Sequence, residues 1–396
     1  MTIQSLYLAV LSVLLTVAIS VSGATKTWDG GAGTILWHDA TNWNPNGVPG
    51  NDLVLLDDNA PTNISMTAGM YPNWSTLEIT KSDADMAFLV RTMCSFGSPT
   101  ALNVHPSVPR TYTLASYVNN AAWYGPTKHT WIVDGTGTVF TMDYIGVTDG
   151  TGTIVTEWNK KGSGMLSVSS LAFSSPSLAK FTIEGTLDLR YYYGYALIGA
   201  LPNATVALAS NGVLWAQGIL VDGWTGTRLP GTGFSGDGTV MLNSALNGTG
   251  TRYSLTSAGA QWIPGTTNTT GLLTVNGNLT FTTNGATACT LKIDITGSGT
   301  TPGVDFDQLY MSGGDLSGNS LSNMELVVTL APKTRTAGKT YRIIDDSGNN
   351  LAGKTFRTTT WIGDPGTTGD VVGVNGGIEL RNVVGWQPRG TAVLLR

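Results

Sequence analysis

Short runs of alternating apolar and polar residues dominate the chain from residue 30 onward. Each run is closed by Gly, Asn, Asp or Ser, the residues that supply turns. No window of eleven or more residues keeps the 3.6-residue period of an amphipathic helix without a Gly, a Pro or clustered β-branched residues interrupting it. The pattern therefore predicts an all-β fold. The clearest runs cover residues 53–56, 130–133, 138–140, 180–183, 187–189, 205–208, 239–242, 272–275 and 279–281.

A turn followed at once by a strand recurs at intervals of roughly 20 to 50 residues, the spacing of one or two coils of a solenoid. In a parallel β-helix each coil stacks on its neighbour, with Leu, Val, Ile and Phe inside, Thr, Ser and Asn outside, and Gly at the corners. We therefore expect a right-handed parallel β-helix over residues 125–345. The alternative is a pair of jelly-roll or sandwich domains built from ordinary hairpins. The recurring phrase occupies residues 135–140, 185–189, 211–214, 236–242 and 275–281.

The first 23 residues have the pattern of a cleaved secretory signal peptide. Their apolar run, residues 6–21, is followed by small residues and is shorter than the ~20 residues that a transmembrane helix needs. No later segment is as long and as apolar, so we expect no transmembrane segment in the mature chain. The expected location is secreted, extracellular or at the cell surface.

The remaining chain divides into three expected parts. Residues 24–124 would form an N-terminal β module or cap with the first coils, residues 125–345 the parallel β-helix, and residues 346–396 a C-terminal β cap or docking segment. In the last part, the strand-like segments 378–380 and 392–395 carry this expectation.

The composition narrows the class of function. Charged residues make up 12% of the chain, about half of the usual ~25%, while 51 of the 396 residues are glycine. With 41% hydrophobic residues the chain is not a disordered charged tail, and a net charge of -5 gives no basic surface for nucleic acid or anionic lipid. The composition therefore predicts a folded protein whose surface consists largely of the uncharged residues Thr, Ser, Asn and Gly.

Two stretches carry a family resemblance. The first reads TWDGG at 27–31, WHDATNW at 37–43 and GVPGND at 47–52; the second reads LLTVNGNLTF at 272–281, DFDQLYMSG at 305–313, YRII at 341–344 and GKTF at 353–356. Together they resemble bacterial autotransporter passenger proteins and relatives with autotransporter-associated β-strand repeats. The resemblance implies a secreted bacterial β-helix protein, and it is specific for architecture rather than activity, since such repeats occur on adhesins, surface filaments and enzymes.

Four aromatic residues are the candidate ligand-binding residues, because aromatic faces suit sugar rings. They are Trp37, Trp43, Tyr193 and Trp215. The favoured interpretation for the N-terminal tryptophans, Trp28 included, is instead a cap that plugs the open first coil and hides its unpaired strand edge.

Catalytic chemistry finds little support, and we assign no catalytic residue, no metal ligand and no cofactor. The three histidines, His38, His105 and His129, are expected on the surface or in loops, and no Gly-x-Ser-x-Gly motif occurs. A glycosidase needs two positioned carboxylates; Asp134, Asp143 and Glu157 are the candidates, although solvated turns explain them better.

Further side chains leave alternatives open. Carboxylate pairs such as 57–58, 305 with 307, and 345–346 could hold Ca²⁺ at a turn, but none has the EF-hand spacing. The two cysteines, Cys94 and Cys289, are expected as buried thiols rather than as a disulfide.

The sequence thus predicts a secreted structural or adhesive β-helix protein of the cell surface. Its expected partners are another copy of itself, through open strand edges at the ends, or extracellular polysaccharide or matrix. Two alternatives remain: a polysaccharide lyase or glycoside hydrolase built on a β-helix, and a non-catalytic carbohydrate-binding protein.

Overall fold

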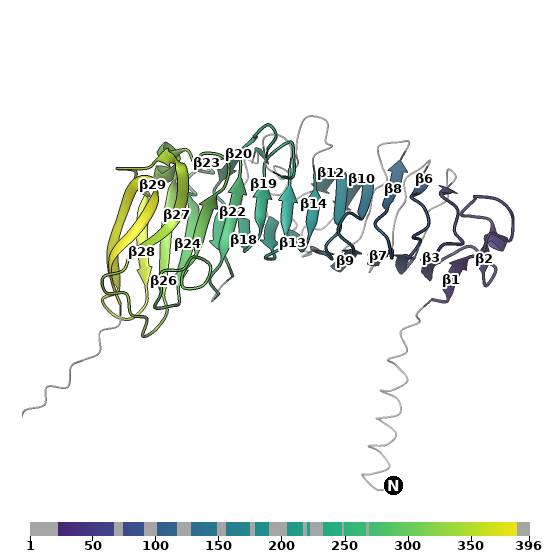
Figure 1. The fold of residues 1–396 in the computed structure, drawn as a ribbon, viewed down its shortest axis with the longest axis horizontal. Helices are drawn as coiled ribbons and strands as arrows, with labels where there is room; N and C mark the ends of the chain where they lie inside the picture. Colours follow the sequence, from purple (N-terminus) through teal and green to yellow (C-terminus); the bar gives the residue numbers. More distant parts are fainter. Residues whose placement is uncertain are drawn as a thin grey trace, which may run out of the picture.

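The protein is an elongated all-β stack in which the strands follow one another along the long axis in sequence order (Figure 1). Two long sheets, A and B, carry most strands, and a small sheet C joins them in part of the stack. The computed structural model describes residues 23–66, 74–90, 101–116, 128–148, 156–174, 179–189, 204–216, 220–221, 233–247, 249–266 and 269–385.

The strands of each sheet are given in their spatial order. Sheet A comprises β2 (Trp43–Asn44), β1 (Thr25–Trp28), β3 (Leu53–Leu56), β5 (Thr76–Ile79), β7 (Ala101–Val104), β9 (Lys128–Val133), β11 (Thr156–Lys161), β13 (Ala179–Ile183), β15 (Ala204–Leu208), β18 (Gly233–Gly236), β21 (Gln261–Pro264), β24 (Cys289–Ile295), β26 (Met324–Leu330) and β28 (Thr358–Ile362). Sheet B comprises β29 (Thr368–Val384), β27 (Tyr341–Asn350), β25 (Gln308–Met311), β22 (Leu272–Asn276), β19 (Thr239–Met241), β16 (Val213–Trp215), β14 (Thr186–Asp188), β12 (Met165–Ser174), β10 (Val139–Thr148), β8 (Thr111–Ser116), β6 (Met86–Val90) and β4 (Asn63–Met66). Sheet C comprises β17 (Leu220–Val221), β20 (Ser254–Ala258) and β23 (Asn278–Thr282), and two short 3₁₀ helices cover Ala40–Asn42 and Gly318–Asn323.

From β3 onward the chain passes from a strand of sheet A to sheet B and then back to sheet A, and we call each such passage a circuit. Neighbouring strands of one sheet come from consecutive circuits and run parallel. Leu53 pairs with Thr76, 23 positions later, and Cys289 pairs with Met324, 35 positions later. Antiparallel pairing between the named strands is confined to the two ends, where β2 meets β1 and β29 meets β27.

The nine runs predicted from the sequence all fall on strands, so that prediction is confirmed. The alternative of sandwich domains built from hairpins is wrong for the described strands, because their partners lie a full circuit away in parallel register. Residues 1–22, the body of the expected signal peptide, lie outside the described residues. Sheet A continues across the expected 124/125 boundary, where Leu102 pairs with Trp131, and the 345/346 boundary falls inside β27.

The core lies between sheets A and B and is built by strict alternation along the strands. In β24 the residues Cys289, Leu291, Ile293 and Ile295 are buried, while the intervening positions, including Lys292, are only partly buried. Such alternation places every second side chain on the inner face of a strand.

Aromatic side chains from consecutive circuits stack inside sheet A. The rings of His129 and Trp158 lie 4.4 Å apart, and those of Phe234 and Trp262 lie 4.7 Å apart. The expectation that His129 lies on the surface is therefore wrong: its position in β9 is inward, and it is fully buried. The flat imidazole stacks on the indole of the next circuit as another aromatic ring would.

The alternation in β24 generates a stability test. Replacing the buried Leu291 with Ala should lower the free energy of unfolding by about 2–5 kcal/mol, because the lost methyl groups leave a cavity between the sheets. The matched control is Lys292→Ala on the same strand, which should change it by no more than about 0.5 kcal/mol. Urea unfolding followed by far-UV circular dichroism measures both, and equal effects would contradict the assignment of inner and outer faces.

Candidate functional site

Four tryptophans close the N-terminal end of the stack. The ring centroids of Trp28 and Trp43 lie 5.0 Å apart, those of Trp37 and Trp43 4.7 Å, and those of Trp37 and Trp74 5.4 Å. None of the four side chains is more than 2% exposed. Trp43 meets both Trp28 and Trp37 edge to face, the arrangement that the ring quadrupoles favour. Trp74, which the sequence analysis missed, enters the cluster from the circuit that follows and anchors the cap to the stack.

A buried asparagine holds the segment that carries these rings. The Asn42 side chain donates to the carbonyl oxygens of Thr34 and Leu36, each at 3.1 Å, and accepts from the Ala32 N–H at 3.2 Å. The indole N–H of Trp43 donates to the Trp37 carbonyl at 2.8 Å. Asn42 and Trp43 of the WHDATNW motif are therefore structural, since their side chains satisfy backbone groups of an irregular segment.

This geometry corrects the candidate sugar-binding residues. Trp37 and Trp43 are completely buried, and Trp215 is 5% exposed, with its indole N–H donating to the Asn243 carbonyl at 2.7 Å. A ring without an exposed face cannot stack on a sugar, so these three residues offer no sugar-binding platform in this structure, and the burial of the N-terminal pair agrees with the cap interpretation. Tyr193 lies outside the described residues.

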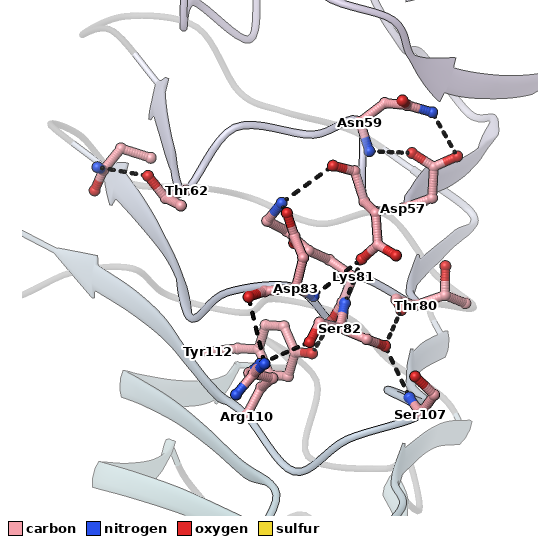
Figure 2. A network of polar contacts seen from close by, with 12 residues as sticks. Asp57, Asn59, Thr62, Thr80, Lys81, Ser82, Asp83, Ser107, Arg110 and Tyr112 are labelled. Atoms are coloured by element: carbon pink, nitrogen blue, oxygen red, sulfur yellow. Dashed lines mark hydrogen bonds and ion pairs between the residues drawn. The ribbon is translucent and has the colours of Figure 1, made fainter.

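A network of polar side chains joins three consecutive circuits at the corner where sheet A gives way to sheet B (Figure 2). At its centre is Lys81, whose side chain is only 3% exposed and whose Nζ lies 2.6 Å from Asp83 Oδ1. The ammonium also donates to the Asp58 carbonyl at 3.3 Å. The hydrogen bond from Lys81 holds the pKa of the Asp83 carboxyl below its usual value.

The rest of the network ties side chains to backbone across the circuits. Asp58 Oδ1 accepts the N–H groups of Ser82 at 2.6 Å and Asp83 at 3.1 Å. Arg110 Nε donates to the Ser82 carbonyl at 2.7 Å, and the Tyr112 hydroxyl donates to the Lys81 carbonyl. Burial raises the pKa of the Tyr112 hydroxyl, which therefore stays a hydrogen-bond donor at neutral pH. Each charge faces a partner within the network, which suits fixing the register of the circuits rather than binding a ligand.

The two carboxylates considered for glycoside hydrolysis whose side chains are described, Asp134 and Glu157, do not converge. Asp134 lies at the corner after β9, where its Oδ2 is 2.8 Å from His105 Nδ1. Glu157 is level with Lys128, six positions before Asp134, which separates the two carboxylates by about 20 Å along the strands. Glycosidase pairs lie about 5 to 9.5 Å apart. The backbone of Asp143 belongs to β10, but its side chain is not among those described.

A second buried lysine lies beside a small apolar cavity lined by Trp131, Trp158, Phe181 and Leu187. Lys160 Nζ donates to the carbonyls of Gly162 at 2.7 Å, Glu184 at 2.9 Å and Lys161 at 2.9 Å. Burial lowers the pKa of Lys160 to about 8. Because an ammonium has three N–H donors, these carbonyls engage all of them, and none is directed at a ligand in the cavity.

In two of the carboxylate pairs considered for calcium, carboxylates accept backbone N–H groups. Asp307 is fully buried and accepts the N–H groups of Gly271 and Asp294, each at 2.7 Å, whereas Asp305 caps the turn at Gly299 and Thr301. Asp346 is likewise fully buried and accepts the Leu316 N–H at 2.9 Å. Asp307 and Asp346 thus connect turns of consecutive circuits, as Lys81 and Lys160 do.

The thiol expectation is met for the cysteine that is described. Cys289 is fully buried, with Sγ 3.3 Å from the Ser257 carbonyl oxygen, while Cys94 lies outside the described residues.

Comparison with protein-family models, with curated proteins and with solved structures returns no match. Within the described ranges, no helix has the length and apolar character needed to cross a membrane.

The tryptophan cap predicts a stability defect rather than a binding defect. Trp43→Ala should lower the free energy of unfolding by about 3–5 kcal/mol, since the ring fills the end of the core. Trp43→Phe should cost about 1 kcal/mol through the lost indole hydrogen bond, beyond any loss of packing. Thermal unfolding measures both changes, and Ile35→Ala, at a 43% exposed position of the same module, is the matched control. A Trp43→Ala protein of unchanged stability would refute the cap.

Asp307 predicts a pH dependence of stability. Burial raises the pKa of its carboxyl to about 8 in the folded chain, against 3.8 for the ordinary group. Since the folded state binds the proton more tightly, the contribution of Asp307 to stability is complete below pH 4, is lost as the pH rises from about 4 to 8, and is constant above that. Asp307→Asn should flatten this part of the profile in urea unfolding measured across the range.

The control for this test is the neighbouring Asp305→Asn. Hydrogen bonds from Thr301 lower the pKa of the partly buried Asp305, so its stabilising contribution is present above the ordinary pKa and is lost only in acid. Asp305→Asn should leave the slope between pH 4 and 8 intact. An Asp307→Asn variant that keeps this slope would show that another group titrates there.

Proposed function

We propose that the chain is a right-handed parallel β-helix that acts as a secreted structural or adhesive rod at a bacterial cell surface, in contact with extracellular polysaccharide or matrix. The observation that carries this proposal is the uninterrupted order of parallel strands in sheets A and B, with partners 21 to 36 positions apart. In a β-helix, each coil would contribute one strand to each of two parallel sheets, and the chain passes between sheets A and B in this way. Right-handed crossovers predominate overwhelmingly in parallel β-structure, which supports the handedness.

The outer surface supports a scaffold role. One outward row of sheet A carries Thr130, Asn159, Thr182, Ala207 and Ser235 in consecutive circuits, all neutral and small. Such a face offers hydroxyl and amide groups to a neutral polysaccharide without a charge pattern. The apolar segment 6–21 and the resemblance to autotransporter passengers support export and a place at the surface.

The polysaccharide lyase or hydrolase is the rival that an experiment must separate. The purified chain should sediment with envelope polysaccharide or with an insoluble polysaccharide from a panel, without releasing reducing ends or unsaturated products. Small-angle X-ray scattering should give an elongated particle. Failure to sediment with any member of the panel, together with retention inside the producing cell, would refute the proposal.

Two variants serve as matched controls for this assay. Asp134→Asn and Glu157→Gln remove the carboxylates that the enzymatic alternative requires, and each side chain lies at least partly outside the core. If the chain is a scaffold, both variants should sediment as the unmodified chain does. Products that appear with the unmodified chain and vanish with either variant would establish the enzyme instead.

A further inference from the structure

The two ends of the stack differ in their backbone. At the C-terminal end, sheet A finishes in β28 and sheet B in β29, and neither strand pairs with a further strand of the described residues (Figure 1). The N–H and C=O groups along such edges need a partner, either water or another backbone. At the N-terminal end, the ammonium of Lys26 holds the segment after β2 by donating to the carbonyls of Pro45 at 2.8 Å and Asn46 at 3.2 Å. The C-terminal end therefore has unpaired strand edges, whereas side chains already engage backbone groups at the N-terminal end.

Exposed aliphatic side chains gather on both ends. Nine large apolar side chains of the described residues are exposed, and five of them lie on the outermost segments of the stack. These five are 39–49% exposed and comprise Ile35, Leu36 and Val48 at the N-terminal end and Ile362 and Val384 at the C-terminal end. Exposed apolar surface that gathers in one place is typical of a contact with another protein. Both ends therefore have the character of contact surfaces.

The two ends also carry opposite net charge. The head, which we define as residues 23–66, contains five aspartates against one lysine, and that lysine, Lys26, is buried. The tail, which we define as residues 331–384, contains seven lysines and arginines against five carboxylates. Charged side chains are exposed at both ends, for example Asp29 in the head and Arg357 in the tail. Contact between unlike ends is therefore electrostatically favourable, whereas contact between like ends brings charges of one sign together.

We propose that the chain associates with further copies of itself head to tail, with the tail of one copy resting on the head of the next. The contact covers the exposed aliphatic side chains of both ends and brings the basic tail onto the acidic head. Because head and tail lie at opposite ends of an elongated molecule (Figure 1), the contact is heterologous and cannot close within a pair. Copies therefore add along the axis of the stack into a filament. This association does not depend on whether the rod also binds a polysaccharide.

Contact between two like ends is the competing arrangement. Tail-to-tail pairing joins the unpaired strand edges to one another, but it sets two net-positive ends together and leaves the exposed aliphatic side chains of the head uncovered. Head-to-head pairing sets two acidic ends together. Either two-fold contact stops at a dimer, whereas a head-to-tail contact continues, so the masses of the assemblies separate the arrangements.

Two double variants that each block one end test the proposal. The head variant carries Ile35→Gln and Leu36→Gln, and the tail variant carries Ile362→Gln and Val384→Gln. All four positions are exposed, so the fold should be retained, as far-UV circular dichroism checks. Each variant should associate about tenfold or more weakly than the unmodified chain, since two aliphatic side chains no longer bury against the next copy. Glutamine is uncharged, so the two blocked ends gain no attraction for each other.

Light scattering over a concentration series measures the assemblies. The unmodified chain should form species of increasing mass as its concentration rises, while each double variant alone stays monomeric at the same concentrations. An equimolar mixture of the two variants should form a dimer and nothing larger, because only the tail of the head variant and the head of the tail variant remain intact. Raising the salt concentration should weaken the association of the unmodified chain, since salt screens the attraction between the ends.

The matched control is a double variant on the side of the rod, Leu89→Gln with Val108→Gln, at positions that are 40% and 47% exposed. It should associate as the unmodified chain does, and its loss of association would move the contact to the side of the rod and overturn the proposal. An unmodified chain that stays monomeric at every concentration overturns it as well. A dimer formed by the head variant alone would establish tail-to-tail pairing instead, and one formed by the tail variant alone would establish head-to-head pairing.

Discussion

The parallel ladder is the constraint on which the rest of the structure depends. From β3 to β28, a described strand of sheet A or B satisfies its backbone groups through the circuits before and after it, because none of these strands pairs with a hairpin partner in its own circuit. Stability therefore accumulates by stacking, and the unsatisfied groups are pushed to the two ends. The tryptophan cap, the two-residue β2 and the antiparallel β29 are responses to this single requirement. Since the ends carry irregular backbone, they also hold the most elaborate hydrogen bonding, as around Asn42.

A second consequence concerns register. The neutral Thr and Asn side chains on the outer face do little to fix the register of one circuit on the next. A slip by one residue would nevertheless turn the inner face outward. Some of the scarce charged residues lie where they prevent this. Lys81, Lys160 and Asp307 are all buried at the passage between the sheets, and each bonds to backbone groups of a neighbouring circuit or of the turn beside it. Each would leave a buried polar or charged group without its partner if the circuits shifted, which makes the wrong register costly.

The sequence predicted the features that local pattern determines. All nine runs became strands, because a period of two is written into neighbouring residues. The sequence alone left open whether Trp37 and Trp43 form a buried cap or an exposed sugar-binding surface. The answer depends on packing against Trp74, which lies one circuit away. The prediction for His129 was wrong because it followed the usual exposure of histidine and not the inward position of this residue in the alternation of β9. Lys160 follows Trp158 by two residues, so the alternation of β11 places both on the inner face. The pattern therefore indicated a buried Lys160, against the usual preference of lysine for solvent.

The geometry of the ladder also supports the proposal that a chain of this composition acts by contact. Side chains in one outward row are about 4.8 Å apart from circuit to circuit, while residues on one face of a strand are about 7 Å apart. Two carboxylates reach catalytic separation most directly when they occupy the same row in neighbouring circuits. In the row that contains Glu157, the neighbour in β13 is Lys180, with Nζ 4.0 Å from the carboxylate, so the position is used for an exposed ion pair. The row beside it is Thr130, Asn159 and Thr182. A surface of this kind repeats the same polar groups at the spacing of the strands, which suits a repeating polymer better than a single reacting bond.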